Sequence, residues 1–236
     1  MAANEFIVMT SGAFTAAHLA LIPDIEKLTQ KKVVTATTSV GTGETSIASR
    51  LKRGEVADLV IVAAPLQKQF VDEGLVLAEG CKSVARSTMG FAVRAGAPKP
   101  DVGTMEGLKK TLLEAKRIAY SASVSGQYFT TELVQRLGIA DQVLPKSRLI
   151  TGGERTGAVV ARGDADLAFQ QISELLPVPG IAHITPLPSE AQRTTEFKAG
   201  VGANSTDRAL AQKVIDFLAS SQAADAVRKT GLEPAN

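Results

Sequence analysis

Small hydroxyl residues and glycines gather where an apolar run gives way to a helical pattern. The four segments are Thr10–Phe14 (TSGAF), Thr37–Ser46 (TTSVGTGETS), Tyr120–Tyr128 (YSASVSGQY) and Gly152–Thr156 (GGERT). Hydroxyls and backbone N–H groups at a helix start can bind an anion, because the helix dipole also favours negative charge there. Glycines let a ligand approach the backbone closely. Each segment alone can equally be a cap and turn, but together they predict an anion site.

Arg155 is the side chain best suited to hold an acidic ligand. Its guanidinium presents five N–H donors in a fixed fork that matches a carboxylate. A solvated surface arginine is the alternative reading. Glu44, Tyr120 and Glu154 lie in the same segments and carry groups that can take or give a proton. If the chain is an enzyme, these three are its candidate catalytic residues.

Several other kinds of site do not fit the residues present. No Gly-Lys-Ser/Thr follows the glycines, so there is no P-loop, and no G-x-S-x-G nucleophile motif occurs. The chain has one cysteine, Cys81, and two histidines, His18 and His183, which cannot form a zinc cluster without carboxylates. We therefore expect no metal and no cofactor. His18 falls in a helical stretch and is expected to be a core or surface residue.

Composition predicts a globular protein of one large or two small domains. The chain has 236 residues, of which 44% are hydrophobic and 21% charged, as in ordinary globular proteins. Its 26 Lys and Arg against 24 Asp and Glu are scattered, which does not favour nucleic acid as a partner. No run approaches the ~20 apolar residues of a membrane span, and we expect no signal peptide within this sequence.

The hydrophobic pattern predicts an α/β fold with parallel strands. Runs of strand length fall at residues 6–9, 32–36, 59–62, 89–94, 118–121, 166–169 and 197–203. Helical periodicity falls at residues 16–28, 45–53, 105–115, 128–137, 155–161, 207–220 and 223–229. The first three polar segments would then lie outside the carboxyl ends of parallel strands, where ligands bind in open α/β sheets.

Five short segments carry a resemblance to a known family: GEVADLVI, VRAGAP, IAYS, RLGI and SQAA, which begin at residues 54, 93, 118, 136 and 221. In order and spacing they resemble the molybdate-binding protein family of type II periplasmic solute-binding proteins. The resemblance covers nearly the whole chain. It implies two lobes, each a mainly parallel sheet flanked by helices, with a ligand held between them. We expect residues 1–84 plus 201–236 in the first lobe and 85–200 in the second.

The resemblance, joined to the polar segments, also implies a ligand-binding set. This set is Ser11, Gly12, Ser39, Thr42, Glu44, Thr45, Ala63, Ser121, Ser125, Arg155 and Gln171. Two of these depart from the family, because Gln171 replaces a tyrosine and Arg155 replaces a small apolar residue. A tetrahedral oxyanion needs only neutral donors, whereas an arginine fork and glutamine amides pair with planar carboxylates. The departures favour an organic di- or tricarboxylate over molybdate.

The sequence favours a binding protein and leaves an isomerase as the alternative. A monomeric periplasmic receptor would bind its small anion and deliver it to an ABC-type membrane permease. An aconitate isomerase, an enzyme similar to the same family in fold and length, would move a proton between cis- and trans-aconitate. The enzyme needs a base beside an activated carbon, whereas the receptor does not. Glu44 would repel an anion unless it is protonated, and its alternative role is a cap on the following helix.

Overall fold

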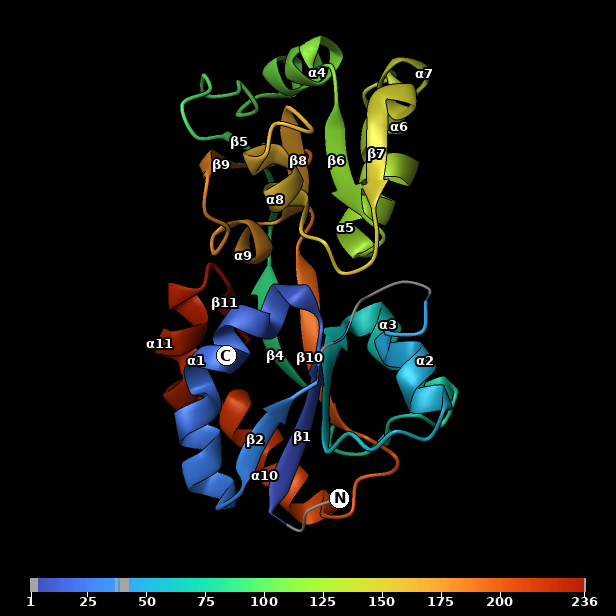
Figure 1. Cartoon of the computed structure of the whole chain (residues 1–236), viewed down its shortest axis with the longest axis vertical. Helices are drawn as coiled ribbons and strands as arrows, with labels where there is room; N and C mark the ends of the chain where they lie inside the picture. Colours follow the sequence, from blue (N-terminus) through green and yellow to red (C-terminus); the bar gives the residue numbers. More distant parts are fainter. Residues whose placement is uncertain (1–3, 37, 39–42, 236) are drawn as a thin grey trace. The chain divides into compact units, whose positions relative to one another are not determined.

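The computed structural model describes residues 4–36, 38 and 43–235, which form two sheets flanked by helices (Figure 1). The chain divides into unit 1, Met1–Ser87 with Thr195–Asn236, and unit 2, Thr88–Thr194. The boundaries expected from the sequence, after residues 84 and 200, fall inside two strands of unit 1 instead. Those strands, β4 (Lys82–Ser87) and β10 (Thr195–Val201), pair with each other in one sheet.

The sheet of unit 1 has the strand order β11-β4-β10-β3-β1-β2. Besides β4 and β10, its strands are β1 (Glu5–Thr10), β2 (Lys32–Thr35), β3 (Leu59–Ala63) and β11 (Glu233–Pro234). Strand β1 runs parallel to β2 and β3, whereas β10 runs antiparallel to β3 and β4. Every residue of β3 is buried, as expected for a central strand covered on both faces.

The helices of unit 1 cover both faces of this sheet (Figure 1). They are α1 (Gly12–Thr29), α2 (Ile47–Lys52), α3 (Ala64–Asp72), α10 (Arg208–Leu218) and α11 (Ser221–Lys229). Val60 and Val62 of β3 belong to one buried cluster with Ile47 and Leu51 of α2 and Phe70 of α3. On α1, Phe14, Leu21 and Ile25 recur on one face and are buried, each contributing about 1.5–3 kcal/mol.

The sheet of unit 2 has the order β7-β6-β8-β5-β9. Its strands are β5 (Met89–Arg94), β6 (Ile118–Ser121), β7 (Ser147–Ile150), β8 (Leu167–Gln171) and β9 (Ile181–Pro186). Strand β6 runs parallel to β7 and β8, and β5 runs antiparallel to β8 and β9. Each unit thus joins a parallel half to an antiparallel half, and the expected α/β fold class is confirmed.

The two faces of the second sheet are packed by different side chains. One face carries large residues, among them Phe91 and Phe169, whose ring centroids are 4.8 Å apart. The other face carries small ones, among them Ala92 and Ala168, so that a helix can approach closely. The helical segments of unit 2 are α4 (Met105–Glu114), α5 (Val124–Tyr128), the π-helical η1 (Phe129–Leu133), α6 (Val134–Arg136), α7 (Ala140–Val143), the 3₁₀-helical η2 (Leu144–Lys146), α8 (Thr156–Ala161) and α9 (Ile172–Leu175).

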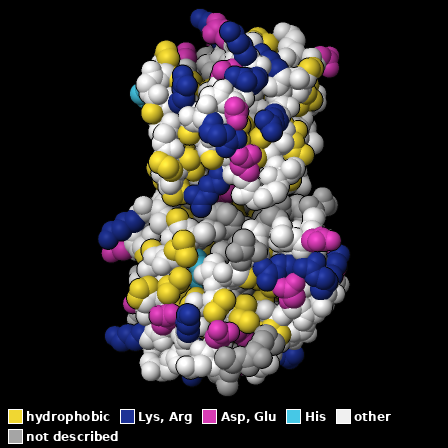
Figure 2. Space-filling model, in the orientation of Figure 1, with side chains coloured by type: hydrophobic (Ala, Val, Ile, Leu, Met, Phe, Trp, Pro, Cys, Tyr) yellow, Lys and Arg dark blue, Asp and Glu magenta, His cyan; other side chains and the backbone are white. Residues whose placement is uncertain are grey.

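Among the described residues, no helix is both long and apolar enough to cross a membrane. On the face shown in Figure 2, Lys and Arg side chains are interspersed with Asp and Glu rather than gathered in one patch.

Candidate functional site

Ser11 lies at the carboxyl edge of the sheet in unit 1, where β1 passes directly into α1. Its backbone N–H donates to the Ile61 carbonyl of the neighbouring strand at 2.9 Å. Ser11 is the N-cap of α1, yet its side chain makes no capping hydrogen bond. The Ser11 Oγ is buried, and within the described residues it has no hydrogen-bond partner. Because a buried hydroxyl without a partner costs about 1–3 kcal/mol, this atom is suited to meet a ligand.

Two further predicted residues lie at the same edge. Gly12 is the exposed first residue of α1. Ala63 ends β3, which pairs with β1, and serves as the N-cap of α3. The structure therefore brings Ser11, Gly12 and Ala63 to neighbouring strand ends of one sheet.

The glycine-rich segment of unit 1 is described in part. Ser39 and Thr42 lie outside the described residues, so their predicted role stays a prediction. Glu44 and Thr45 are exposed. The cap of α2 is Ser46, whose hydroxyl accepts from the Ser49 N–H at 3.1 Å. The alternative reading of Glu44 as that cap is therefore wrong, because a serine already occupies the capping position.

A closed ring of hydrogen bonds holds the carboxyl edge of unit 2. The Gln170 Nε2 donates to Ser121 Oγ at 2.8 Å, and the Ser125 hydroxyl donates to Gln170 Oε1. Ser123 Oγ lies 2.8 Å from Ser121 Oγ and 2.9 Å from Ser125 Oγ. The Gln171 N–H donates to Gln170 Oε1 at 3.0 Å, which fixes the orientation of the amide. Each hydroxyl can then donate one hydrogen bond: Ser121 to Ser123, Ser123 to Ser125, and Ser125 to Gln170.

The ring separates its serines into two roles. Ser121 and Ser123 are half-buried, whereas Ser125 is 0% exposed and lies behind them against Gln170. A Cβ at Gly126 would collide with the Ser121 carbonyl oxygen, so only glycine lets α5 begin this close to the strand. The sequence singled out Ser121 and Ser125 but not Gln170, whose role depends on partners 45 and 49 residues away.

Arg155 and Thr156 begin α8, on the chain that follows β7. Arg155 is exposed, and in the described part of the chain it forms no salt bridge. Thr156 is buried, and its Oγ1 has no hydrogen-bond partner among the described residues. The sequence did not single out Thr156 as a ligand contact, although the hydroxyl directly follows the predicted arginine. Gln171, at the end of β8, is buried.

The acidic candidates of unit 2 differ in their surroundings. Glu154 Oε1 lies 2.6 Å from an Arg162 guanidinium nitrogen, and this pairing raises the pKa of Arg162. Glu174, on α9 and half-buried, was not predicted from the sequence. Burial raises the pKa of Glu174 to about 7, while the charge of Arg155 acts in the opposite direction. Tyr120 packs on Phe129, with ring centroids 5.6 Å apart.

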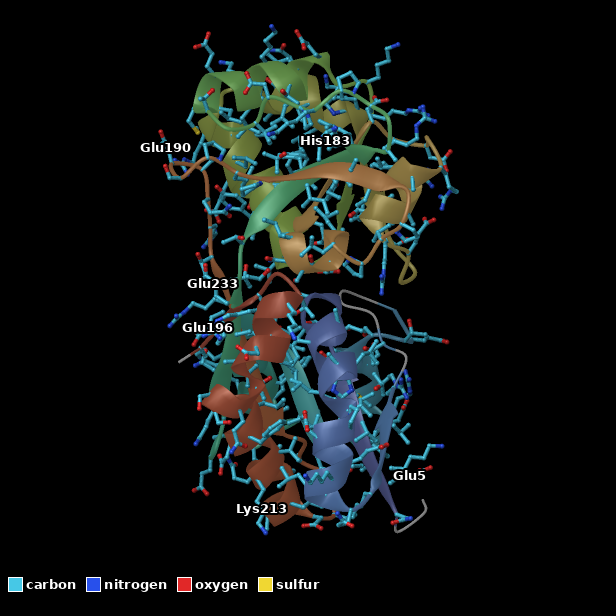
Figure 3. The ribbon with its side chains drawn as sticks, turned by 90° about the vertical axis from the view of Figure 1, so that its left-hand side faces the viewer. Glu5, His183, Glu190, Glu196, Lys213 and Glu233 are labelled. Atoms are coloured by element: carbon cyan, nitrogen blue, oxygen red, sulfur yellow. The ribbon has the colours of Figure 1, made fainter. Side chains whose placement is uncertain are left out.

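The histidines lie in different units. His18 is buried in unit 1 with its Nε2 2.8 Å from Thr35 Oγ1, and burial lowers its pKa to about 4. It is therefore neutral at physiological pH. His183 is exposed on β9 in unit 2 (Figure 3). Among the described residues, no three of His, Cys, Asp and Glu gather where they could hold a metal ion.

Nearly the whole chain is similar to bacterial extracellular solute-binding proteins and to an aconitate isomerase. Residues 6–233 match the model of a family described as bacterial extracellular solute-binding protein. An aconitate isomerase of Pseudomonas sp is 37% identical over 228 residues, which cover 96% of this chain and 87% of that protein.

Two solved structures share the fold at low identity. The periplasmic molybdate-binding protein of Azotobacter vinelandii has a TM-score of 0.79 at 16% identity, covering 98% of this chain and 100% of that chain. The sulfate-binding protein of Mycobacterium tuberculosis H37Rv has a TM-score of 0.73 at 16% identity, covering 99% and 88%. At this identity the likeness concerns the fold alone.

Proposed function

Because this chain belongs to the bacterial extracellular solute-binding protein family, we propose that it binds an organic tricarboxylate and isomerises aconitate between its cis and trans forms. The observation that carries this proposal is the 37% identity to an aconitate isomerase across 96% of the chain. The matched length spans nearly all of this chain, including the segments that bear the candidate site.

The donors at the two strand edges support a polyacid ligand. Unit 1 offers the Ser11 hydroxyl at the start of α1. Unit 2 offers the exposed guanidinium of Arg155 and the buried hydroxyl of Thr156. A guanidinium fork pairs with both oxygens of one carboxylate, and neutral donors can accept the remaining charge. Aconitate carries three carboxylates, so it can use donors of both kinds.

The reaction is a shift of one proton along three carbons. A base takes a proton from the CH₂ carbon, and the electron pair of that C–H bond forms the new double bond. The electrons of the old double bond move to the far carbon, where the adjacent carboxylate delocalises them. Return of the proton to that carbon completes the shift without net oxidation or reduction. Arg155 and the hydroxyl donors would stabilise the charge that develops on the carboxylates.

A second function is favoured by the fold. The molybdate- and sulfate-binding proteins that share it suggest a periplasmic receptor that delivers a polyacid to an ABC-type permease. Such a receptor needs tight binding but no proton transfer. The two functions therefore differ in turnover, not in the ligand.

Proton NMR of the purified protein with trans-aconitate in deuterated water separates the two functions. We expect conversion to the cis isomer at a low protein-to-substrate ratio, and deuterium in the product would report exchange of the transferred proton with the solvent. Arg155→Ala should slow it, and Glu114→Gln, on the exposed face of α4, should not. Chemical-shift changes without turnover would leave a receptor, and tight molybdate binding with no response to any polycarboxylate would overturn both.

A further inference from the structure

Two carboxylates lie near the carboxyl edge of the sheet in unit 2, and they differ in what binds them. Glu154 is held by Arg162 at 2.6 Å. Glu174 forms no hydrogen bond or salt bridge with the other described residues, and its side chain is half-buried. Partial burial without donors disfavours the charged form of a carboxylate, whereas an ion pair favours it. Glu174 is therefore better suited than Glu154 to exchange a proton.

The position of Glu174 places it beside the predicted ligand donors. Strand β8 ends at Gln171, and Glu174 follows three residues later on α9. The charge of Arg155, at the start of α8, acts on the Glu174 carboxylate. Elements α8 and α9 pack on the same small-residue face of the sheet, through Val159 and Leu175. A guanidinium that can hold a carboxylate and a carboxylate that can take a proton thus lie on two elements that pack on one face of the sheet.

We infer that Glu174 is the base that takes the proton from the CH₂ carbon of aconitate and returns it to the far carbon, while Arg155 holds an adjacent carboxylate. This inference rests on the proposed isomerase function. In the first half of the reaction the Glu174 carboxylate gains the proton as the double bond moves. In the second half the carboxyl group gives that proton back, so that Glu174 ends in its starting state.

The protonation state of Glu174 suits this role. Burial brings its pKa to about 7, with Arg155 as the opposing charge. A group whose pKa lies near the working pH can both take and give a proton efficiently. The other candidates are less well placed, since Glu154 is ion-paired and Tyr120 is packed on Phe129 in the core cluster.

The test compares Glu174→Gln with Glu154→Gln, using Glu114→Gln on α4 as the matched control. We expect Glu174→Gln to lower kcat by about 10²–10⁴-fold, while calorimetric affinity for cis-aconitate stays within a few-fold of the wild type. Glu114→Gln should keep at least half of the wild-type kcat, and Glu154→Gln should lose less activity than Glu174→Gln. Glu174→Asp should retain more activity than Glu174→Gln, because it keeps a carboxylate.

A pH profile adds a readout that a structural role would not change. For the wild type, kcat/KM should fall as pH decreases through about 7, where Glu174 becomes protonated. In Glu174→Gln the residual kcat/KM should not show this decrease. Wild-type turnover that survives in Glu174→Gln, or that is lost equally in Glu154→Gln, would overturn the role of Glu174 alone. No turnover by the folded wild-type protein would instead overturn the isomerase function and this inference with it.

Discussion

In both units a helix begins after a strand at the carboxyl edge of the sheet, but the side chains at these edges differ. Ser11 in unit 1 and Thr156 in unit 2 each carry a buried hydroxyl that has no partner among the described residues. Unit 2 adds the Arg155 guanidinium, the Glu174 carboxylate and a hydrogen-bonded ring around Gln170. Neutral donors suffice to bind an anion, whereas chemistry at carbon needs a group that exchanges protons. The comparison indicates that unit 2 would carry the reactive groups.

The largest expected difference between the units is the sign of their response to acid. Burial lowers the pKa of His18 from 6.5 to about 4, so between these values the unfolded chain binds a proton that the folded chain does not. The stability of unit 1 should fall over this window as pH falls, by about 3 kcal/mol. Burial raises the pKa of Glu174 from 4.5 to about 7. Its contribution to stability is full below 4.5 and is lost as pH rises through about 7.

Urea unfolding midpoints measured between pH 4.5 and about 7 test this opposition. His18→Gln should reduce the loss of stability in acid, and Glu174→Gln should steepen it, because the opposing gain is removed. The quantity to compare is the slope of the unfolding midpoint against pH, since either variant can change stability at one pH for other reasons. Identical slopes in all three proteins would remove the contrast between the units.

The second prediction concerns affinity. The larger loss of affinity should come from a substitution in unit 2. Arg155→Ala should raise the Kd for cis-aconitate by at least about tenfold, because a hydrogen bond to a charged group contributes about 1.5–3 kcal/mol. Arg155→Lys should recover only part of the affinity, since an ammonium lacks the planar fork. Isothermal titration calorimetry at fixed salt measures both variants. An unchanged Kd in Arg155→Ala would remove the guanidinium from the site.

The third prediction compares two buried serines that differ in their partners. Ser125→Ala should lower the free energy of unfolding by about 1–2 kcal/mol, because the Ser125 hydroxyl binds Gln170 and closes the ring. Ser11→Ala should leave it unchanged or raise it by up to about 1–3 kcal/mol, since the buried Ser11 Oγ has no partner to lose among the described residues. Urea titration of the two variants measures the difference. A larger loss in Ser11→Ala would contradict the assigned pairing.

The smallest effect should be that of Ser11→Ala on binding. Loss of one neutral donor should raise the Kd for cis-aconitate a few-fold, equivalent to about 0.5–1.5 kcal/mol. Calorimetry of this variant beside Arg155→Ala ranks the two side chains by their contribution to the affinity. A larger effect for Ser11 than for Arg155 would invert the comparison.

The fold could be predicted best where strands are buried on both faces. Strands β1 and β3 read as apolar runs at residues 6–9 and 59–62 and lie where expected. Strands β4, β7 and β9 were not predicted. The sequence KSVARS of β4 mixes polar and apolar residues, and β9 is half-buried or exposed along its length. Such strands leave little periodic signal, because pairing rather than burial defines them.

The candidate site could be predicted where a hydroxyl ends a strand or directly follows one, as at Ser121 and Ser11. Gln170, Thr156 and Glu174 could not, because their roles depend on contacts that no local spacing encodes. Gln170 meets Ser125 across 45 residues, and the burial of Glu174 depends on the packing of α9 against the sheet. Local patterns thus locate strand ends, whereas the pairing of distant side chains at those ends needs the structure.

The central position of β10 in unit 1 has a consequence for how the protein folds during synthesis. Strand β10 lies between β3 and β4, and Ser205 donates to Asp58 across 147 residues. Residues 88–194 form a continuous unit and can fold while the ribosome still holds the strand that completes the first sheet. Until that strand emerges, β3 and β4 expose unpaired edges, which are templates for aggregation. Slowing translation before residue 195 should therefore favour misassembly of the first sheet more than of the second.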